Sequence, residues 1–121
     1  MNLRDKPLAV IHSEASVRTE ISAFCPRYQY TLELIGRRWV GAILRALLRE
    51  PKRFNEILSA IPGLSDRLLT ERLRELESEG IVRRTVHGER PVRVVYELTP
   101  CGISLEPVIR SIGQWAEAWV S

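Results

Sequence analysis

Among the polar side chains of residues 65–79, four have a spacing that predicts one face of a helix: Arg67, Thr70, Glu71 and Arg74. At about 100° per residue these four share one sector, and three leucines lie opposite, Leu69, Leu73 and Leu76. Arginine can clamp a guanine edge, threonine can contact a phosphate or a thymine methyl group, and glutamate can accept from cytosine N4. These side-chain types would suit a helix that reads bases in the major groove of DNA.

Two plainer interpretations apply to the same face. Glu71 can instead form one-turn ion pairs with Arg67 or Arg74. The charges can also be an ordinary solvated surface, because residues 65–97 hold seven arginines and seven acidic residues. Local net charge therefore gives no support to DNA binding, and the order of the surrounding elements must decide.

Four further residues are candidates for DNA contact. Lys52 and Arg53 stand at the start of the preceding predicted helix, where they could bind phosphates. Arg90, with His87 nearby, falls in a predicted turn at 87–91 and could reach a flanking minor groove. Ser65 is the expected N-cap of the reading helix and completes the predicted DNA-binding set.

Apolar periodicity predicts three helices ahead of the reading helix. The first runs to Ile35, where Gly36 could end it in a left-handed cap. The second covers 39–48 and stops before Pro51, because a residue preceding proline disfavours helical geometry. Phe54–Ile61 follows as a short third helix.

The turn "PGLS" at 62–65 joins this third helix to the reading helix, which Gly80 ends. Residues 81–99 then predict a β-hairpin whose second strand, 92–98, is half-buried. Thr99 and Pro100 suit the start of a last helix. The fold class is thus mainly α with a small β-hairpin, a winged helix-turn-helix with an added C-terminal helix. In that fold the second helix of the motif enters the major groove.

The last helix carries a long apolar stripe: Leu105, Val108, Ile109, Ile112, Trp115, Ala116 and Trp119. The stripe could fold back onto its own domain, but its length and two tryptophans favour a symmetry mate. We therefore expect a two-fold homodimer through this helix and the N-terminal segment. Its operator would be a palindrome with half-sites about one helical turn apart, or a multiple of that.

Composition fits one domain of 121 residues: an arm at 1–24, partly disordered or loosely helical, and a DNA-binding domain at 25–121. The charge of +3 and the pI of about 9.2 lean weakly towards an acidic partner. Of the 18 basic residues only Lys6 and Lys52 are lysines, which suits bidentate contacts but also follows from a G- and C-rich genome.

Several function classes find no support in these residues. Two cysteines and two histidines are too few for a metal site or a His-based triad, and no nucleophile–base pair or phosphate loop can be assembled. No segment reaches the length of a membrane span or has the pattern of a signal peptide. We therefore expect a cytoplasmic protein that is not an enzyme, holds no cofactor or metal, and has no membrane partner.

Five motifs resemble the HxlR-type winged helix regulators of bacteria: "CP" at 25–26, "IGRRW" at 35–39, "KRFNEI" at 52–57, "LTERLRELESEGIV" from Leu69, and "YELTPCG" from Tyr96. The resemblance runs from Cys25 to about Trp119. It implies a dimeric, sequence-specific transcriptional regulator, more often a repressor, that acts near its own promoter. The sequence departs from the family's usual double proline at the wing, with Pro91 followed by Val92, and from the glycine pair before the tryptophan, with Gly36 followed by Arg37.

The resemblance also implies a role for Cys25, since in some members the cysteine before that proline senses oxidants or electrophiles. Unpaired N–H groups at a helix start and the nearby Arg27 would favour its thiolate. Cys101 has a similar position before the last helix, and an inert thiol is the plain alternative for both. A winged helix used only for protein–protein contact is the runner-up to DNA binding. No effector can be named from the sequence.

Overall fold

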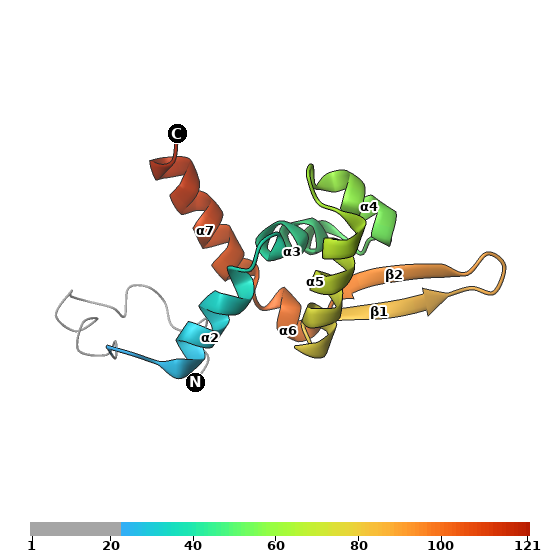
Figure 1. The fold of residues 1–121 in the computed structure, drawn as a ribbon, viewed down its shortest axis with the longest axis horizontal. Coiled ribbons are helices and arrows are strands. Elements are labelled where there is room, and N and C mark those ends of the chain that lie inside the picture. The colour runs from blue at the N-terminus through green and yellow to red at the C-terminus, as the bar shows by residue number, and fades with distance from the viewer. Residues whose placement is uncertain (1–22) are drawn as a thin grey trace. The chain divides into compact units, whose positions relative to one another are not determined.

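The structure, a computed structural model, describes residues 23–121. The chain divides into two compact units, Met1–Glu33 and Leu34–Ser121. The predicted arm at 1–24 lies outside the described residues except for Ala23 and Phe24. Figure 1 shows the elements with their labels.

Helix α2 (Pro26–Ile35) begins in the first unit, and its last two residues belong to the second. It begins at a proline, which suits the first helical position because its missing N–H has no partner there. The Gln29 N–H donates to the Cys25 carbonyl at 3.0 Å, and the Thr31 hydroxyl donates to the Arg27 carbonyl at 2.8 Å. The predicted first helix is therefore present.

The turn between α2 and α3 (Val40–Arg49) corrects one prediction. Gly36 was expected in the left-handed conformation, but the left-handed residue is Trp39, with φ of 76°, at the N-cap of α3. A non-glycine residue pays roughly 1–2 kcal/mol for this conformation. The contacts of Trp39 explain why it is held there: its ring packs against Gly63, and the Arg38 guanidinium lies 5.3 Å from the ring centroid.

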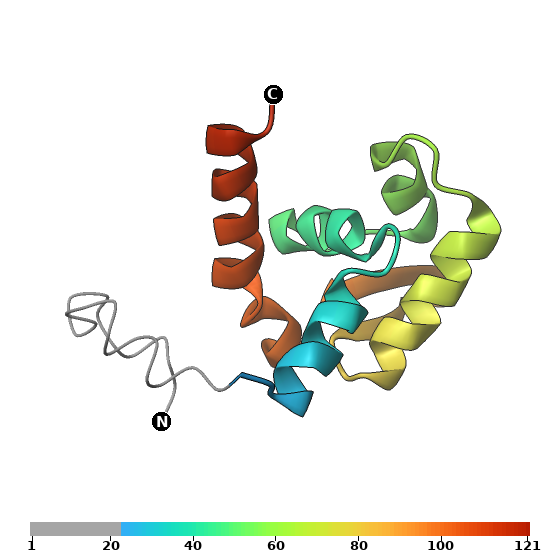
Figure 2. The same cartoon turned by 60° about the vertical axis from the view of Figure 1, so that its left-hand side comes forward.

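The second unit is a helical domain with one hairpin. After α3 come α4 (Phe54–Ala60) and α5 (Asp66–Ser78), then the strands β1 (Val82–His87) and β2 (Arg93–Leu98). In both views α3 lies between α7 (Glu106–Trp119) on one side and α4 and α5 on the other (Figures 1 and 2). The order of elements confirms the predicted winged helix-turn-helix.

The core forms where the apolar stripes of these helices meet the base of the hairpin. Its fully buried members are Val40, Ile43, Leu44, Ile57, Leu69, Leu73 and Leu76. Burying a side chain of this size contributes about 1.5–3 kcal/mol, so the three leucines of α5 fasten that helix firmly to the domain. The predicted buried stripe of the reading helix is confirmed.

The hairpin is antiparallel, with Val82 opposite Leu98 and His87 opposite Arg93. Only its base is buried, at Val82 and Leu98; Val92 is exposed and precedes the strand. The sequence alternates apolar Val92, Val94, Tyr96 and Leu98 with Arg93, Val95 and Glu97, which predicts alternating burial; this is wrong in detail, because residues 94–97 are all half-buried. Lys52 adds a one-residue bridge to Tyr96 through backbone bonds of 2.9 and 2.7 Å, which no periodicity predicts.

The expected last helix is two helices, α6 (Pro100–Ile103) and α7. Thr99 caps α6 as predicted, its hydroxyl accepting from the Gly102 N–H at 3.2 Å. The helix cannot continue through Pro107, which lacks the N–H that would bond one turn back and which stands in the first turn of α7. Pro107, seven residues after Pro100, was the signal in the sequence for this break.

The apolar stripe of α7 divides by exposure. Ile109 is buried and Leu105 half-buried against the domain, so part of the stripe does fold back. Ala116 is half-buried as well, whereas Trp115 is 62% and Trp119 76% exposed, beside exposed Val108 and Ile112. Within the described residues no helix combines the length and the apolar character that crossing a membrane requires.

Candidate nucleic-acid interface

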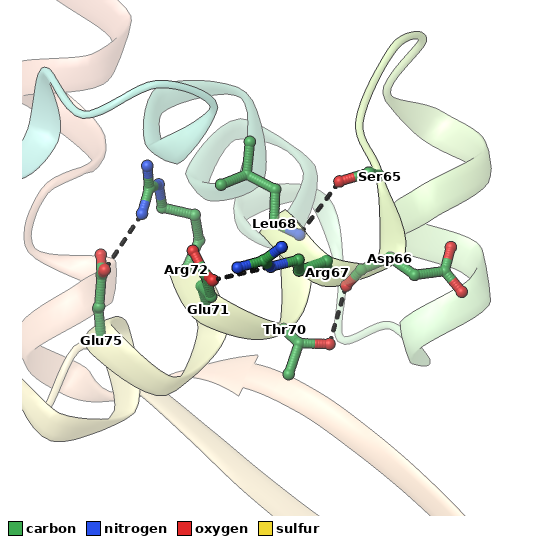
Figure 3. Close-up of polar contacts among 8 residues, drawn as sticks. All are labelled: Ser65, Asp66, Arg67, Leu68, Thr70, Glu71, Arg72 and Glu75. Carbon is green, nitrogen blue, oxygen red and sulfur yellow. Dashed lines mark hydrogen bonds and ion pairs between the residues drawn. The ribbon is translucent and has the colours of Figure 1, made fainter.

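Helix α5 is capped at the end that would meet DNA. The Ser65 hydroxyl accepts a hydrogen bond from the Leu68 N–H at 3.2 Å, as the sequence predicts (Figure 3). The cap fixes where the first turn begins, and therefore which residues stand on its outer side. Ser65 itself is exposed beside that turn.

The predicted reading face is on the outside of α5. The Arg67 side chain is 91% exposed, and its Nε lies 3.5 Å from Glu71 Oε1. This is the one-turn ion pair that we considered as the alternative role of Glu71. Such exposed pairs contribute little free energy, so Arg67 can exchange it for a DNA contact. Arg74 is exposed as well.

The hydroxyl of Thr70 is already used within the helix. It donates to the Asp66 carbonyl at 2.8 Å (Figure 3). Because that bond uses the only hydroxyl proton, a phosphate oxygen would have to displace the carbonyl to accept from Thr70. The methyl group remains available, which favours contact with a thymine methyl over contact with a phosphate.

Lys52 and Arg53 stand in different surroundings although they are adjacent. The Lys52 side chain is only 14% exposed, and its Nζ lies 3.2 Å from Glu50 Oε1. Arg53 is the N-cap of α4, where its backbone N–H donates to Glu56 Oε1 at 2.8 Å while the residue stays exposed. Arg53 is therefore the better placed of the two for a phosphate contact.

The tip of the hairpin carries the predicted Arg90 and His87, both exposed. The register adds two residues that sequence reasoning missed. Arg93 is paired across the hairpin with His87, so both side chains lie on one face of the wing; exposed Arg84 lies on the other. Counting back from the turn would have found this pairing. Arg83 forms an ion pair with Glu97 at 3.2 Å.

Cys25, in the first unit, is half-exposed at the start of α2. The pKa of its thiol lies below the ordinary value, first because of the Tyr28 backbone N–H and then because of the backbone N–H and guanidinium of Arg27. Both causes were expected from the position of Cys25 at a helix start. Cys101 is exposed, and no disulfide joins the two.

No cluster of three or more potential metal ligands occurs among residues 23–121. The described part of the chain thus holds a capped helix with exposed arginines, a preceding helix with a basic N-terminus, and a basic hairpin tip. Their chemistry suits contact with bases and phosphates.

Comparison with known proteins gives the same assignment. The family described as HxlR-like helix-turn-helix matches residues 34–121. The HTH-type transcriptional regulator YvaP of Bacillus subtilis is 46% identical over 99 residues, which cover 82% of this chain and 92% of YvaP.

Two solved regulators are also similar in structure. Reduced YodB of Bacillus subtilis superposes with a TM-score of 0.74 at 42% identity, covering 81% of this chain and 96% of YodB. YodB has also been solved after diamide treatment and with a bound quinone. The redox regulator HypR in reduced form gives a TM-score of 0.72 at 39% identity, covering 76% of this chain and 91% of HypR. The chain belongs to the HxlR-like helix-turn-helix family and is a DNA-binding transcriptional regulator.

Proposed function

We propose that the protein is a repressor that binds a palindromic operator as a homodimer, with α5 in the major groove and the wing at 87–91 in the flanking minor groove. One observation carries the proposal: α5 is capped by Ser65, fixed by three buried leucines and exposes Arg67 and Arg74 on its outer side. Repression, in place of activation, follows from the resemblance to the HxlR-type family.

The homodimer is supported by where the apolar surface lies. On α7 the exposed apolar residues are Val108, Ile112, Trp115 and Trp119, and α2 exposes Tyr28 and Leu32 one turn apart. Each is an exposed apolar surface within its own unit, and such surface on a protein of this size marks an interaction site. A second copy is the partner we propose, because a two-fold dimer presents two reading helices to the two halves of a palindrome.

The proposed contacts divide by what they read. Arg67, Thr70, Glu71 and Arg74 face bases, Arg53 contacts a phosphate with Lys52 beside it, and Arg90 reaches the minor groove. Ser65 borders the base-reading face and acts mainly through its cap. A winged helix used only for protein contact would have no need of exposed arginines on α5, and this distinguishes the runner-up.

Footprinting on the DNA upstream of the protein's own gene, followed by gel shifts at two salt concentrations, tests the proposal. Arg67→Ala is expected to weaken operator binding by about 1–3 kcal/mol and to relax preference at one base position. Arg53→Ala is expected to weaken binding to all sequences and to reduce the salt slope by about one.

Arg45→Ala serves as the matched control, because Arg45 is an exposed arginine on α3 beside Gly113 of α7 and outside the proposed DNA-contacting residues. It should bind like the wild type. Unchanged affinity and unchanged base preference in Arg67→Ala would show that α5 does not read the operator.

We also propose that Cys25 gives the regulator a response to electrophiles. The lowered pKa of Cys25 supports this, because the thiolate is the reactive form. Two similar proteins add support, since HypR is described as a redox regulator and YodB has been solved with a bound quinone. A thiol-reactive electrophile should then release the wild type and Cys101→Ser from the operator, while Cys25→Ser binds normally and ignores the treatment.

The pH dependence of alkylation tests the thiolate directly. In a Cys101→Ser background, the rate of reaction with iodoacetamide should rise with pH through a midpoint below that of an ordinary thiol, because the lowered pKa extends the thiolate to lower pH. Arg27→Gln should raise the midpoint only partway, since the Tyr28 N–H is the larger cause. A midpoint at the ordinary thiol value, with DNA binding intact after peroxide, would contradict the proposal.

A further inference from the structure

Arg72 lies on the reading helix but does not belong to the reading face. At about 100° per residue it is rotated by roughly 150° from the middle of that face. Its side chain is only 15% exposed. Its Nε donates to the Arg38 carbonyl at 2.9 Å, and its Nη1 donates to Glu75 Oε1 at 3.1 Å. Figure 3 shows the Arg72 side chain directed towards Glu75.

Glu75 extends this contact to the turn before α3. While Oε1 accepts from Arg72, the buried Oε2 lies 3.0 Å from Arg37 Nη1 in an ion pair that lacks hydrogen-bond alignment. One carboxylate thus joins the middle of α5 to Arg37, and Arg72 joins it to Arg38. Both partners are in the turn at 36–39. A charge-assisted hydrogen bond and an ion pair therefore join α5 to this turn.

The same turn contacts the helix-turn-helix at a second point. The ring of left-handed Trp39 packs on Gly63, in the turn between α4 and α5, so closely that a Cβ there would lie 3.3 Å from Trp39 Cη2. We call the segment 36–39 and its contacts with Gly63, Arg72 and Glu75 the 36–39 brace. It holds α5 ahead of its first turn and again at its middle, so it opposes rotation about the helix axis.

Rotation of α5 matters because base contacts are short. A helix with side chains has a radius of about 5–6 Å, so a rotation of about 15° moves an outward group by about 1.5 Å. Hydrogen bonds to a base edge hold only between about 2.7 and 3.2 Å. The three buried leucines prevent α5 from leaving the core, but apolar contacts are not directional. The hydrogen bonds of Arg72 are directional, so they can fix the rotation of α5 where the leucine contacts cannot.

We propose that Arg72 is a positioning residue: through Arg38 and Glu75 it sets the rotation of α5, and thereby the base preference of Arg67 and Arg74, without touching DNA. This rests on the proposed function of α5 as the reading helix. Arg74 is thus proposed to contact bases, whereas Arg72, two positions earlier, is proposed to position the helix.

Arg72→Met tests the proposal, because methionine keeps most of the buried stem and removes the donors. Affinity for the footprinted operator should fall about tenfold, while affinity for unrelated DNA changes by less than about twofold. The salt slope should stay at the wild-type value, in contrast to Arg53→Ala, because Arg72 neutralises no phosphate. Arg45→Met is the matched control and should match the wild type in all three measurements.

Two further variants keep the test decisive if Arg72→Met folds poorly. Glu75→Gln removes the charge and keeps the shape, so it should show the same pattern with a smaller loss. Arg72→Lys keeps the charge but loses the planar fork that spans the Arg38 carbonyl and Glu75, and should recover part of the preference. A reduced salt slope, or an unchanged operator affinity in a folded variant, would overturn the proposal.

A DNA-free measurement separates this proposal from the function of α5. Residual dipolar couplings of the full chain should show that α5 is reoriented relative to α3 in Arg72→Met and is not reoriented in Arg45→Met. If the wild type shows no base preference, the proposed function fails, and the couplings still decide whether Arg72 sets the helix. An α5 orientation that Arg72→Met leaves unchanged overturns the positioning role.

Discussion

The arginine side chains of α5 differ most in how strongly contacts within the domain already fix their conformation. Arg67 stands almost wholly in solvent with one weak ion pair, so it can adapt to a base edge at the cost of its rotamer freedom. Arg72 is held by two bonds and has no such freedom. Sequence reasoning could place Arg67, because helical periodicity shows which residues face outward. It could not find Arg72, whose partner is a backbone carbonyl 34 residues away.

Two glycines give a matched prediction at this scale. Gly63 has φ of +89° and touches the Trp39 ring, so Gly63→Ala should lower the free energy of unfolding by about 1–2 kcal/mol. Gly41 lies within α3 with no atom near its missing Cβ, so Gly41→Ala should raise it by about 0.5–1 kcal/mol. Urea unfolding followed by circular dichroism measures both.

The test is whether the free energy of unfolding falls in Gly63→Ala and rises in Gly41→Ala. A stabilised Gly63→Ala would mean that residue 63 is not left-handed and tightly packed in solution. A destabilised Gly41→Ala would mean that something covers α3 at this position.

At the scale of elements, the helices and the hairpin follow from features that the sequence displays locally. Caps at Ser65 and Thr99 and the breaks at Pro51 and Gly80 act within a few residues, and these boundaries were predicted. Three features of the fold were not predicted, two because they depend on distant partners and one because a local signal was missed. The left-handed Trp39 and the Lys52 bridge need contacts that only the fold supplies, whereas the α6–α7 break was readable from Pro107.

The cap of α5 can be separated from its DNA surface by two substitutions at Ser65. Ser65→Ala removes the acceptor for the Leu68 N–H and should cost about 1 kcal/mol of stability. Ser65→Asp keeps an acceptor and adds a favourable charge at a helix N-terminus, so stability should hold. Its carboxylate would meet phosphates, however, and operator binding should weaken.

Thermal unfolding and gel shifts of the two variants provide the measurement. Equal DNA binding by Ser65→Asp and the wild type would place the start of α5 away from the DNA backbone. A Ser65→Ala variant as stable as the wild type would show that water replaces the cap without loss.

At the scale of the whole molecule, the exposed tryptophans of α7 predict the assembly. Trp115→Lys would place a charge in the apolar stripe, and the protein should become a monomer by light scattering at micromolar concentration. Operator affinity should fall steeply, because one reading helix cannot span two half-sites. Gln114→Lys is the control, since Gln114 is exposed on the same helix outside the stripe and should leave the assembly intact. A wild-type monomer at this concentration would contradict the dimer.

The hairpin packs on the core through its base, at Val82, Tyr96 and Leu98, while residues 86–93 at its tip are all exposed. Residues 86–93 can therefore vary without changing any packed atom of the domain. Selection can then alter what the tip recognises beside the operator while α5 and its brace stay constant. Related regulators built on this plan should diverge fastest at the wing tip, and a graft of another wing tip should transfer flanking preference while leaving the central base preference in place.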